Sequence, residues 1–120
     1  MAVRKLDAAT WTPAAQLHDW GVVGAPITQP PCALRGDKMV LPLPGAPEAG
    51  IWECSPGRYQ RQIRSAEAMV VLSGEATFAP LEGDSITLRQ GDVWFFDSGT
   101  LGEWHILQPL RKFYLVFTPG

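Results

Sequence analysis

Cysteine is scarce in this sequence, with two residues in a chain of 120. Cys32 and Cys54 do not form a C-x-x-C pair, and nothing in the sequence places a base beside either of them. A catalytic cysteine is therefore disfavoured, and we expect both residues to be free thiols packed as small hydrophobes. A chain of this length buries roughly two-thirds of its unfolded surface, so it needs no disulfide or metal to fold.

An excess of charge of one sign is also lacking, as are long apolar runs. The formal net charge of -2 and the pI near 5.6 do not supply the basic patch that nucleic acid requires. The apolar stretches are far shorter than the roughly 20 residues that cross a bilayer. Residues 1–11 have no apolar core of a secretory signal. We therefore expect a cytoplasmic protein that binds neither nucleic acid nor membrane.

Glycine and proline, in contrast, are abundant, with 12 and 11 residues spread along the chain. This punctuation into short segments is typical of an all-β protein with many turns. Six prolines between residues 26 and 47 exclude a central helix there. We expect residues 1–44 to form an N-terminal arm with edge strands such as 38–43, although residues 8–21 also allow a short helix.

The pattern becomes regular in residues 45–120, where apolar runs alternate with glycine-bearing turns. Strands are predicted over residues 50–55, 58–64, 67–74, 75–81, 86–89 and 93–99, with one or two more over 103–118. The predicted turn between the third and fourth of these strands is Ser73-Gly74. This spacing predicts a single-domain sandwich or barrel.

Glu67 is the most unusual residue of the barrel segment, because it opens the apolar run Ala-Met-Val-Val-Leu. Strand alternation puts Glu67 on one face with Met69 and Val71, so it is predicted to point into the barrel. A buried carboxylate needs an ion-pair partner, hydrogen bonds or a metal ion. A solvated position at the start of the strand is the remaining alternative.

Several segments resemble the cupin superfamily. Glu67, six residues and Gly74 match the second half of the first cupin motif, and Gly91 and Gly99 match the glycines of the second. The segments "GIWECSPGRYQR", "GEWHI" and "LRKFYLVF" resemble the small ethanolamine-utilisation-like and ureidoglycine-aminohydrolase-like cupins. This resemblance covers roughly residues 45 to 118. It implies an RmlC-like double-stranded β-helix, the cupin jelly-roll barrel, and a homodimer that pairs through N-terminal strands.

The histidines of the cupin metal centre are missing from the matching positions. The His-x-His pair is replaced by Arg61 and Ile63, or by Gln60 and Gln62, and Gly102 stands at the later histidine. Only Glu67 remains of the usual ligands, so no cofactor is expected. If a metal is bound, Glu67 would hold Mn, Fe, Ni or Zn.

Glu103 and His105 offer a second route to a metal site, because a residue beside the second-motif Trp ligates metal in some of these relatives. Both residues flank Trp104 and share one strand face. If Trp104 points into the barrel, Glu103 and His105 point away from it.

An internal ion pair is the interpretation of Glu67 that we favour. Arg58, Arg61 and Arg64 precede it, and we expect Arg61 to be its partner. The pair would be structural, or it would anchor a small carboxylate or polar ligand.

Three functions remain open: a small cupin that binds a polar metabolite, a metal-assisted hydrolase or isomerase acting on a nitrogenous or sugar-like compound, and a structural or interaction protein. A free pocket lined by Glu67, Arg61 and Trp104 would favour the first. The catalytic candidates are Glu67, His105 and Tyr114. The expected ligand-binding residues are Arg61, Ile63, Glu67, Met69, Trp94, Trp104 and Tyr114.

Overall fold

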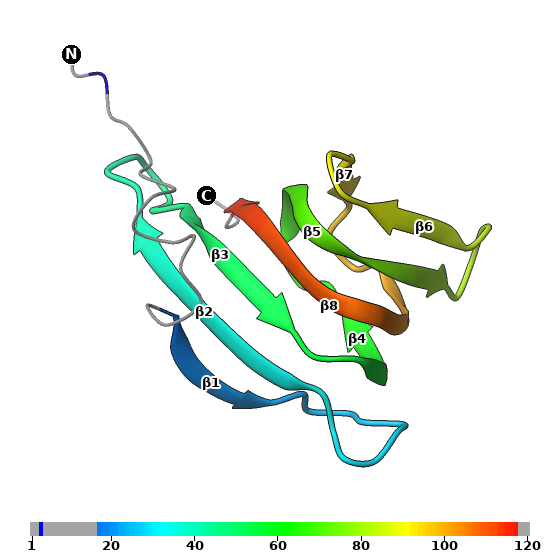
Figure 1. Cartoon of the computed structure of the whole chain (residues 1–120). Coiled ribbons are helices and arrows are strands. Elements are labelled where there is room, and N and C mark those ends of the chain that lie inside the picture. Colours follow the sequence, from blue (N-terminus) through cyan, green and yellow to red (C-terminus); the bar gives the residue numbers. More distant parts are fainter. Residues whose placement is uncertain (1–2, 4–16, 118–120) are drawn as a thin grey trace.

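Every regular element in the described part of the chain is a β-strand. The computed structural model describes residue 3 and residues 17–117 (Figure 1). The strands are β1 (His18–Val22), β2 (Ala33–Val40), β3 (Glu48–Cys54), β4 (Gly57–Gln62), β5 (Ala66–Pro80), β6 (Ile86–Arg89), β7 (Val93–Phe96) and β8 (Leu101–Phe117). No helix among these residues is long and apolar enough to cross a membrane.

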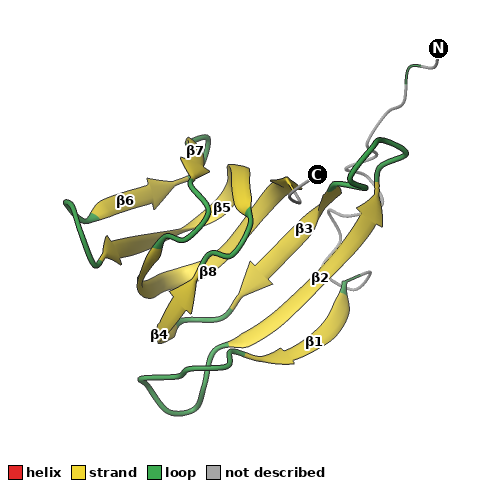
Figure 2. Ribbon diagram, turned by 180° about the vertical axis from the view of Figure 1, so that it is seen from behind, coloured by secondary structure: helices red, strands yellow, loops and turns green. Residues whose placement is uncertain are grey.

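The two longest strands, β5 and β8, pair antiparallel along most of their length and connect two layers. The first half of β5 and the second half of β8 belong to a layer in the order β1-β2-β3-β8-β5-β7. Their other halves form a second layer in the order β4-β8-β5-β6. Figures 1 and 2 show both strands running through the middle of the molecule. This antiparallel arrangement confirms the predicted single-domain cupin jelly roll.

The predicted turn at Ser73-Gly74 is wrong, because β5 continues through this point from residue 66 to residue 80. Its register against β8 shifts between Val71 and Ala76, and Gly74 has a φ of 92°. Such irregularities bend a strand without ending it. Here the bend lets one strand serve both layers.

The N-terminal region extends the first layer beyond β3. Residues 18–22 form a strand rather than part of the helix that the sequence allowed, and residues 8–16 lie outside the described residues. β2 spans residues 33–40, so only the beginning of the predicted strand at 38–43 is part of it. These two strands bring Trp20 and Leu34 to the interior of the molecule.

The alternation predicted for β5 is confirmed. Glu67, Met69 and Val71 are buried with 8%, 1% and 1% of their surface exposed, whereas the residues between them are half-buried. Between the layers the Phe96 ring stacks on Trp104, with ring centres 5.7 Å apart, and Phe78 meets both rings edge-on. Aromatic contacts of this kind hold the two layers together.

Cys32 and Cys54 are free and fully buried, as expected. Burial raises the pKa of the Cys54 thiol, and the neighbouring Cys32 raises it further. A thiol with a raised pKa stays protonated and is a poor nucleophile. Both cysteines are therefore packing residues of the interior.

An ion-pair cluster lies on the outer face of the first layer, where Glu53 on β3 accepts hydrogen bonds from Arg35 on β2 and Arg111 on β8. Burial alone would raise the pKa of Glu53. The hydrogen bonds and charges of the two arginines outweigh burial, so the pKa lies below its ordinary value of 4.5. The cluster joins three neighbouring strands.

Glu53→Gln should therefore remove part of the acid sensitivity of the fold. A carboxyl group whose pKa is lowered by folding contributes its full stability above its unfolded pKa, and this contribution is lost as the pH falls through the lowered value. Urea unfolding of both proteins between about pH 7 and about pH 3 measures the effect. The exposed Glu82→Gln is the control. Equal losses of free energy in wild type and Glu53→Gln would contradict the prediction.

Candidate functional site

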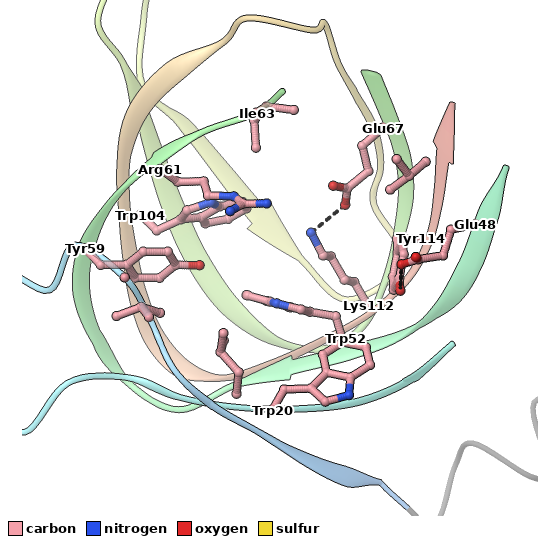
Figure 3. Close-up of a pocket in the computed structure, with 14 residues that line it drawn as sticks. Trp20, Glu48, Trp52, Tyr59, Arg61, Ile63, Glu67, Trp104, Lys112 and Tyr114 are labelled. Atoms are coloured by element: carbon pink, nitrogen blue, oxygen red, sulfur yellow. Dashed lines mark hydrogen bonds and ion pairs between the residues drawn. The ribbon is translucent and has the colours of Figure 1, made fainter. Parts of the chain in front are cut away.

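A pocket of about 290 Å³ lies inside the jelly roll, and five aromatic and four charged side chains dominate its lining (Figure 3). The aromatic residues are Trp20, Trp52, Tyr59, Trp104 and Tyr114. The charged residues are Glu48, Arg61, Glu67 and Lys112. This volume is near the lower limit for ligand pockets, and aromatic walls with a few polar groups are typical of them. The pocket is large enough for a small molecule.

Glu67 forms its ion pair with Lys112, so the prediction that Arg61 is the partner is wrong. Lys112 Nζ donates a hydrogen bond to Glu67 Oε2 at 2.6 Å, and the two side chains are only 7% and 10% exposed. They are the only charged residues classed as buried in the described part of the chain. The physical reason is the topology, since β4 pairs with β8 in the second layer, whereas Glu67 and Lys112 lie on adjacent strands of the first.

The ammonium group of Lys112 is enclosed by aromatic rings as well. Its Nζ lies 4.5 Å from the centre of the Trp52 ring and 5.7 Å from that of Trp104. Lysine over an aromatic face gains cation–π attraction, which grows when the site is desolvated. The protein thus holds one positive charge of its own at the centre of the pocket (Figure 3).

Arg61 reaches the same pocket from β4 and remains exposed. No carboxylate among the described residues lies within ion-pair distance of its guanidinium group. Figure 3 shows Arg61 and Lys112 directed into the pocket from different sides. Between them they offer more hydrogen-bond donors than Glu67 uses.

Tyr114 is tied to a second carboxylate. Its hydroxyl donates to Glu48 Oε2 at 2.6 Å, and Lys38 Nζ lies 3.8 Å from the other carboxylate oxygen of Glu48. Burial raises the pKa of Tyr114, and the hydrogen bond and charge of Glu48 raise it further. Tyr114 therefore remains a protonated hydrogen-bond donor at neutral pH.

The predicted site residues separate into two groups. The structure brings Arg61, Ile63, Glu67, Trp104 and Tyr114 together around the pocket. Met69 and Trp94 do not line it; Met69 is buried in the core, and Trp94 packs against the core with its Nε1 lacking a partner among the described residues.

His105 also lies away from the pocket. Trp104 is 2% exposed and points inward, so its neighbours Glu103 and His105 face the other side of β8. Glu103 accepts hydrogen bonds from Arg58 at 2.7 and 2.9 Å. The mixed site of Glu67, Glu103 and His105 is therefore not assembled.

The residues present do not fit the metal centre of a typical cupin. Among residues 17–117, no group of three or more His, Cys, Asp or Glu side chains could hold a metal ion. Of the two carboxylates that line the pocket, Glu48 accepts the hydrogen bond of Tyr114, and the Lys112 ammonium occupies that of Glu67. A divalent ion placed there would have to displace that ammonium and would gain one protein ligand.

Of the nine aromatic and charged residues that line the pocket, five were not predicted as site residues from the sequence: Trp20, Glu48, Trp52, Tyr59 and Lys112. A signal for Lys112 existed, because Lys112, Trp104 and Tyr114 are all even-numbered residues of β8, and alternate residues of a strand point to the same face. All three are buried on the inner face, whereas the odd-numbered residues beside them are more exposed. Trp20 had no such signal, because its place depends on how the N-terminal region folds back.

Comparison with known proteins identifies relatives by sequence and by structure. Residues 44–114, more than half of the chain, match the EutQ-like cupin domain. A comparison with curated proteins found no match.

Among solved structures, a DUF861-family protein of unknown function from Pseudomonas syringae pv. tomato is 23% identical with a TM-score of 0.75. The match covers 83% of this chain but only 43% of that one. A putative ethanolamine utilization protein Q from Salmonella typhimurium is 21% identical over 73% of this chain and 72% of its own, with a TM-score of 0.62. These likenesses support the fold, and the match over residues 44–114 shows that the chain belongs to the family of EutQ-like cupin domains.

Proposed function

We propose that this cupin binds a small organic anion, specifically a carboxylate, in the pocket between its two layers, without a metal ion. The observation that carries the proposal is the charge pattern of the pocket. Lys112 is neutralised by Glu67, and Glu48 is engaged by Tyr114 and lies near Lys38. Arg61 lacks a carboxylate partner among the described residues that line the pocket.

A carboxylate fits the donors that remain. The planar guanidinium of Arg61 can bind both oxygens of a carboxylate in parallel hydrogen bonds. Lys112 has three N–H donors and gives one of them to Glu67. Trp20, Trp52 and Trp104 line the pocket and offer an apolar wall for the rest of the ligand. The protein thus combines an anion anchor with an apolar chamber, as small-molecule sites commonly do.

Arg61→Met should weaken carboxylate binding by about tenfold or more, which corresponds to roughly 1.4 kcal/mol. The probes for calorimetry are lactate and benzoate, each compared with its uncharged amide. Arg64→Met is the matched control, because it removes the same charge two residues beyond β4 at a residue that does not line the pocket. Amides that bind as well as the acids, or equal losses in both variants, would contradict the proposal.

A metal-assisted hydrolase or isomerase is the second candidate, and the spacing from Glu67 to Gly74, which resembles the first cupin motif, is what favours it. It has less support, since Lys112 competes with any metal for Glu67. Elemental analysis after incubation with Mn, Fe, Ni or Zn and desalting separates the two. Close to one retained metal per chain that is lost in Glu67→Ala would support this second candidate against our proposal.

A further inference from the structure

The position of the Lys112 amine is suited to a nucleophile. It lies in the pocket, 2.6 Å from a carboxylate that can accept its proton, and the surrounding rings limit water around it. Lysine amines in apolar pockets form imines with carbonyl compounds. Lys38, by comparison, is 60% exposed and has Glu48 only at 3.8 Å.

We propose that Lys112 captures a small 2-oxo acid as a reversible imine while Arg61 holds the carboxylate of that acid. The inference rests on the proposed function, since it uses the same anion anchor and adds a carbonyl carbon beside it. Two groups that recognise different parts of one ligand face the same pocket (Figure 3). A hydroxy acid such as lactate fills the same anchor but cannot form the covalent bond.

The reaction balances with the groups that the pocket supplies. The Lys112 ammonium passes a proton to Glu67, and the neutral amine attacks the carbonyl carbon, forming a C–N bond as the C=O π pair moves to oxygen. Glu67 returns its proton to that oxygen, giving a hydroxyl group. It then takes a proton from the attacking nitrogen and passes it to the hydroxyl, which leaves as water when the C=N bond forms. Ammonium and ketone thus become iminium and water, with no oxidant or reductant.

The surroundings suit the product as well as the amine. The iminium keeps the single positive charge that the ammonium carried. It would lie over the ring of Trp52 and beside the carboxylate of Glu67, where that charge is stabilised already. Capture therefore replaces one cation with another and leaves no new buried charge uncompensated.

Reductive trapping tests the inference in the intact protein. The protein is incubated with pyruvate and sodium cyanoborohydride, and peptide mass spectrometry gives the rate of modification at each lysine. We expect Lys112 to react at least about tenfold faster than the exposed Lys38 of the same molecule. Arg61→Met should slow the reaction about tenfold, Arg64→Met should leave it unchanged, and lactate should protect Lys112.

The outcomes separate this inference from the proposed function. Lactate binding by calorimetry without preferential trapping at Lys112 would overturn the imine and leave the carboxylate site standing. If lactate does not bind and Lys112 is not preferentially trapped, both the imine and the carboxylate site are overturned. A rate of trapping at Lys112 that is changed neither by Arg61→Met nor by lactate would support the imine but overturn the carboxylate anchor. Because Lys38 is an internal reference, the test does not depend on whether a Lys112 variant folds.

Discussion

Glu67→Gln is expected to lower the free energy of unfolding by about 3 kcal/mol, which for a domain of this size is a fall in Tm of roughly 10 °C. The substitution keeps the shape of the side chain and removes only its charge. The Lys112 side chain, which is only 7% exposed, would then carry its charge with no carboxylate to compensate it. Breaking a buried pair from one side costs this much because a charge is left in a poorly solvated place.

A variant of the partner Lys112 and a double variant test whether the loss of stability comes from breaking the ion pair. Lys112→Met should cost a similar amount, because it leaves the Glu67 carboxylate buried and unpaired. Glu67→Gln combined with Lys112→Met should lose clearly less than the sum of the two, since neither charge remains. Glu103→Gln is the control. Glu103 pairs with Arg58, but the two side chains are 30% and 44% exposed, so this ion pair should contribute at most about 1 kcal/mol.

Two results would contradict this account of Glu67. A Tm unchanged by Glu67→Gln would mean that the carboxylate is solvated and that its burial contributes nothing. Additive losses in the double variant would mean that Glu67 and Lys112 act separately. Thermal unfolding followed by circular dichroism, with urea unfolding for the free energies, distinguishes these results.

The direction in which Glu67 points could be predicted from the sequence, but its partner could not. Alternation along one strand depends only on backbone geometry, so the inward face of Glu67 and Met69 followed from local sequence. The partner depends on which strands are neighbours. Arg61 is six residues away in the chain but belongs to the other layer, whereas Lys112 is 45 residues away and lies on the adjacent strand.

The same limit applies to the N-terminal region. Its prolines predicted irregular structure with edge strands, and β1 and β2 do extend the edge of the first layer. Nothing local to Trp20 indicated that it would line the pocket, because that position follows from the pairing of β1 with β2. The homodimer that the family resemblance implies stays a prediction, which sedimentation of the purified protein would test.

Gly74→Ala is expected to be the second severe substitution, with a loss of about 3 kcal/mol or more. Glycine was predicted here as a turn residue, and the structure shows why glycine is needed at a bend instead. A Cβ at this position would lie 2.1 Å from the carbonyl oxygen of Pro109 on β8, and the φ of 92° is unfavourable for any residue with a side chain. Both strands that connect the layers would have to move apart at this contact.

Gly91→Ala is the matched control for Gly74→Ala, because Gly91 has a φ of 89° and a Cβ there would meet no atom within 4 Å. It isolates the backbone strain, which costs about 1 to 2 kcal/mol. We therefore expect urea unfolding to show a loss at Gly74 at least about 1 kcal/mol greater than the loss at Gly91. Equal losses of free energy in the two variants would mean that β8 can move away from the new Cβ at Pro109 at no cost in stability. A greater loss at Gly74 would mean that the close approach of β5 and β8 fixes the bend, and with it the separation of the two layers that leaves room for the pocket.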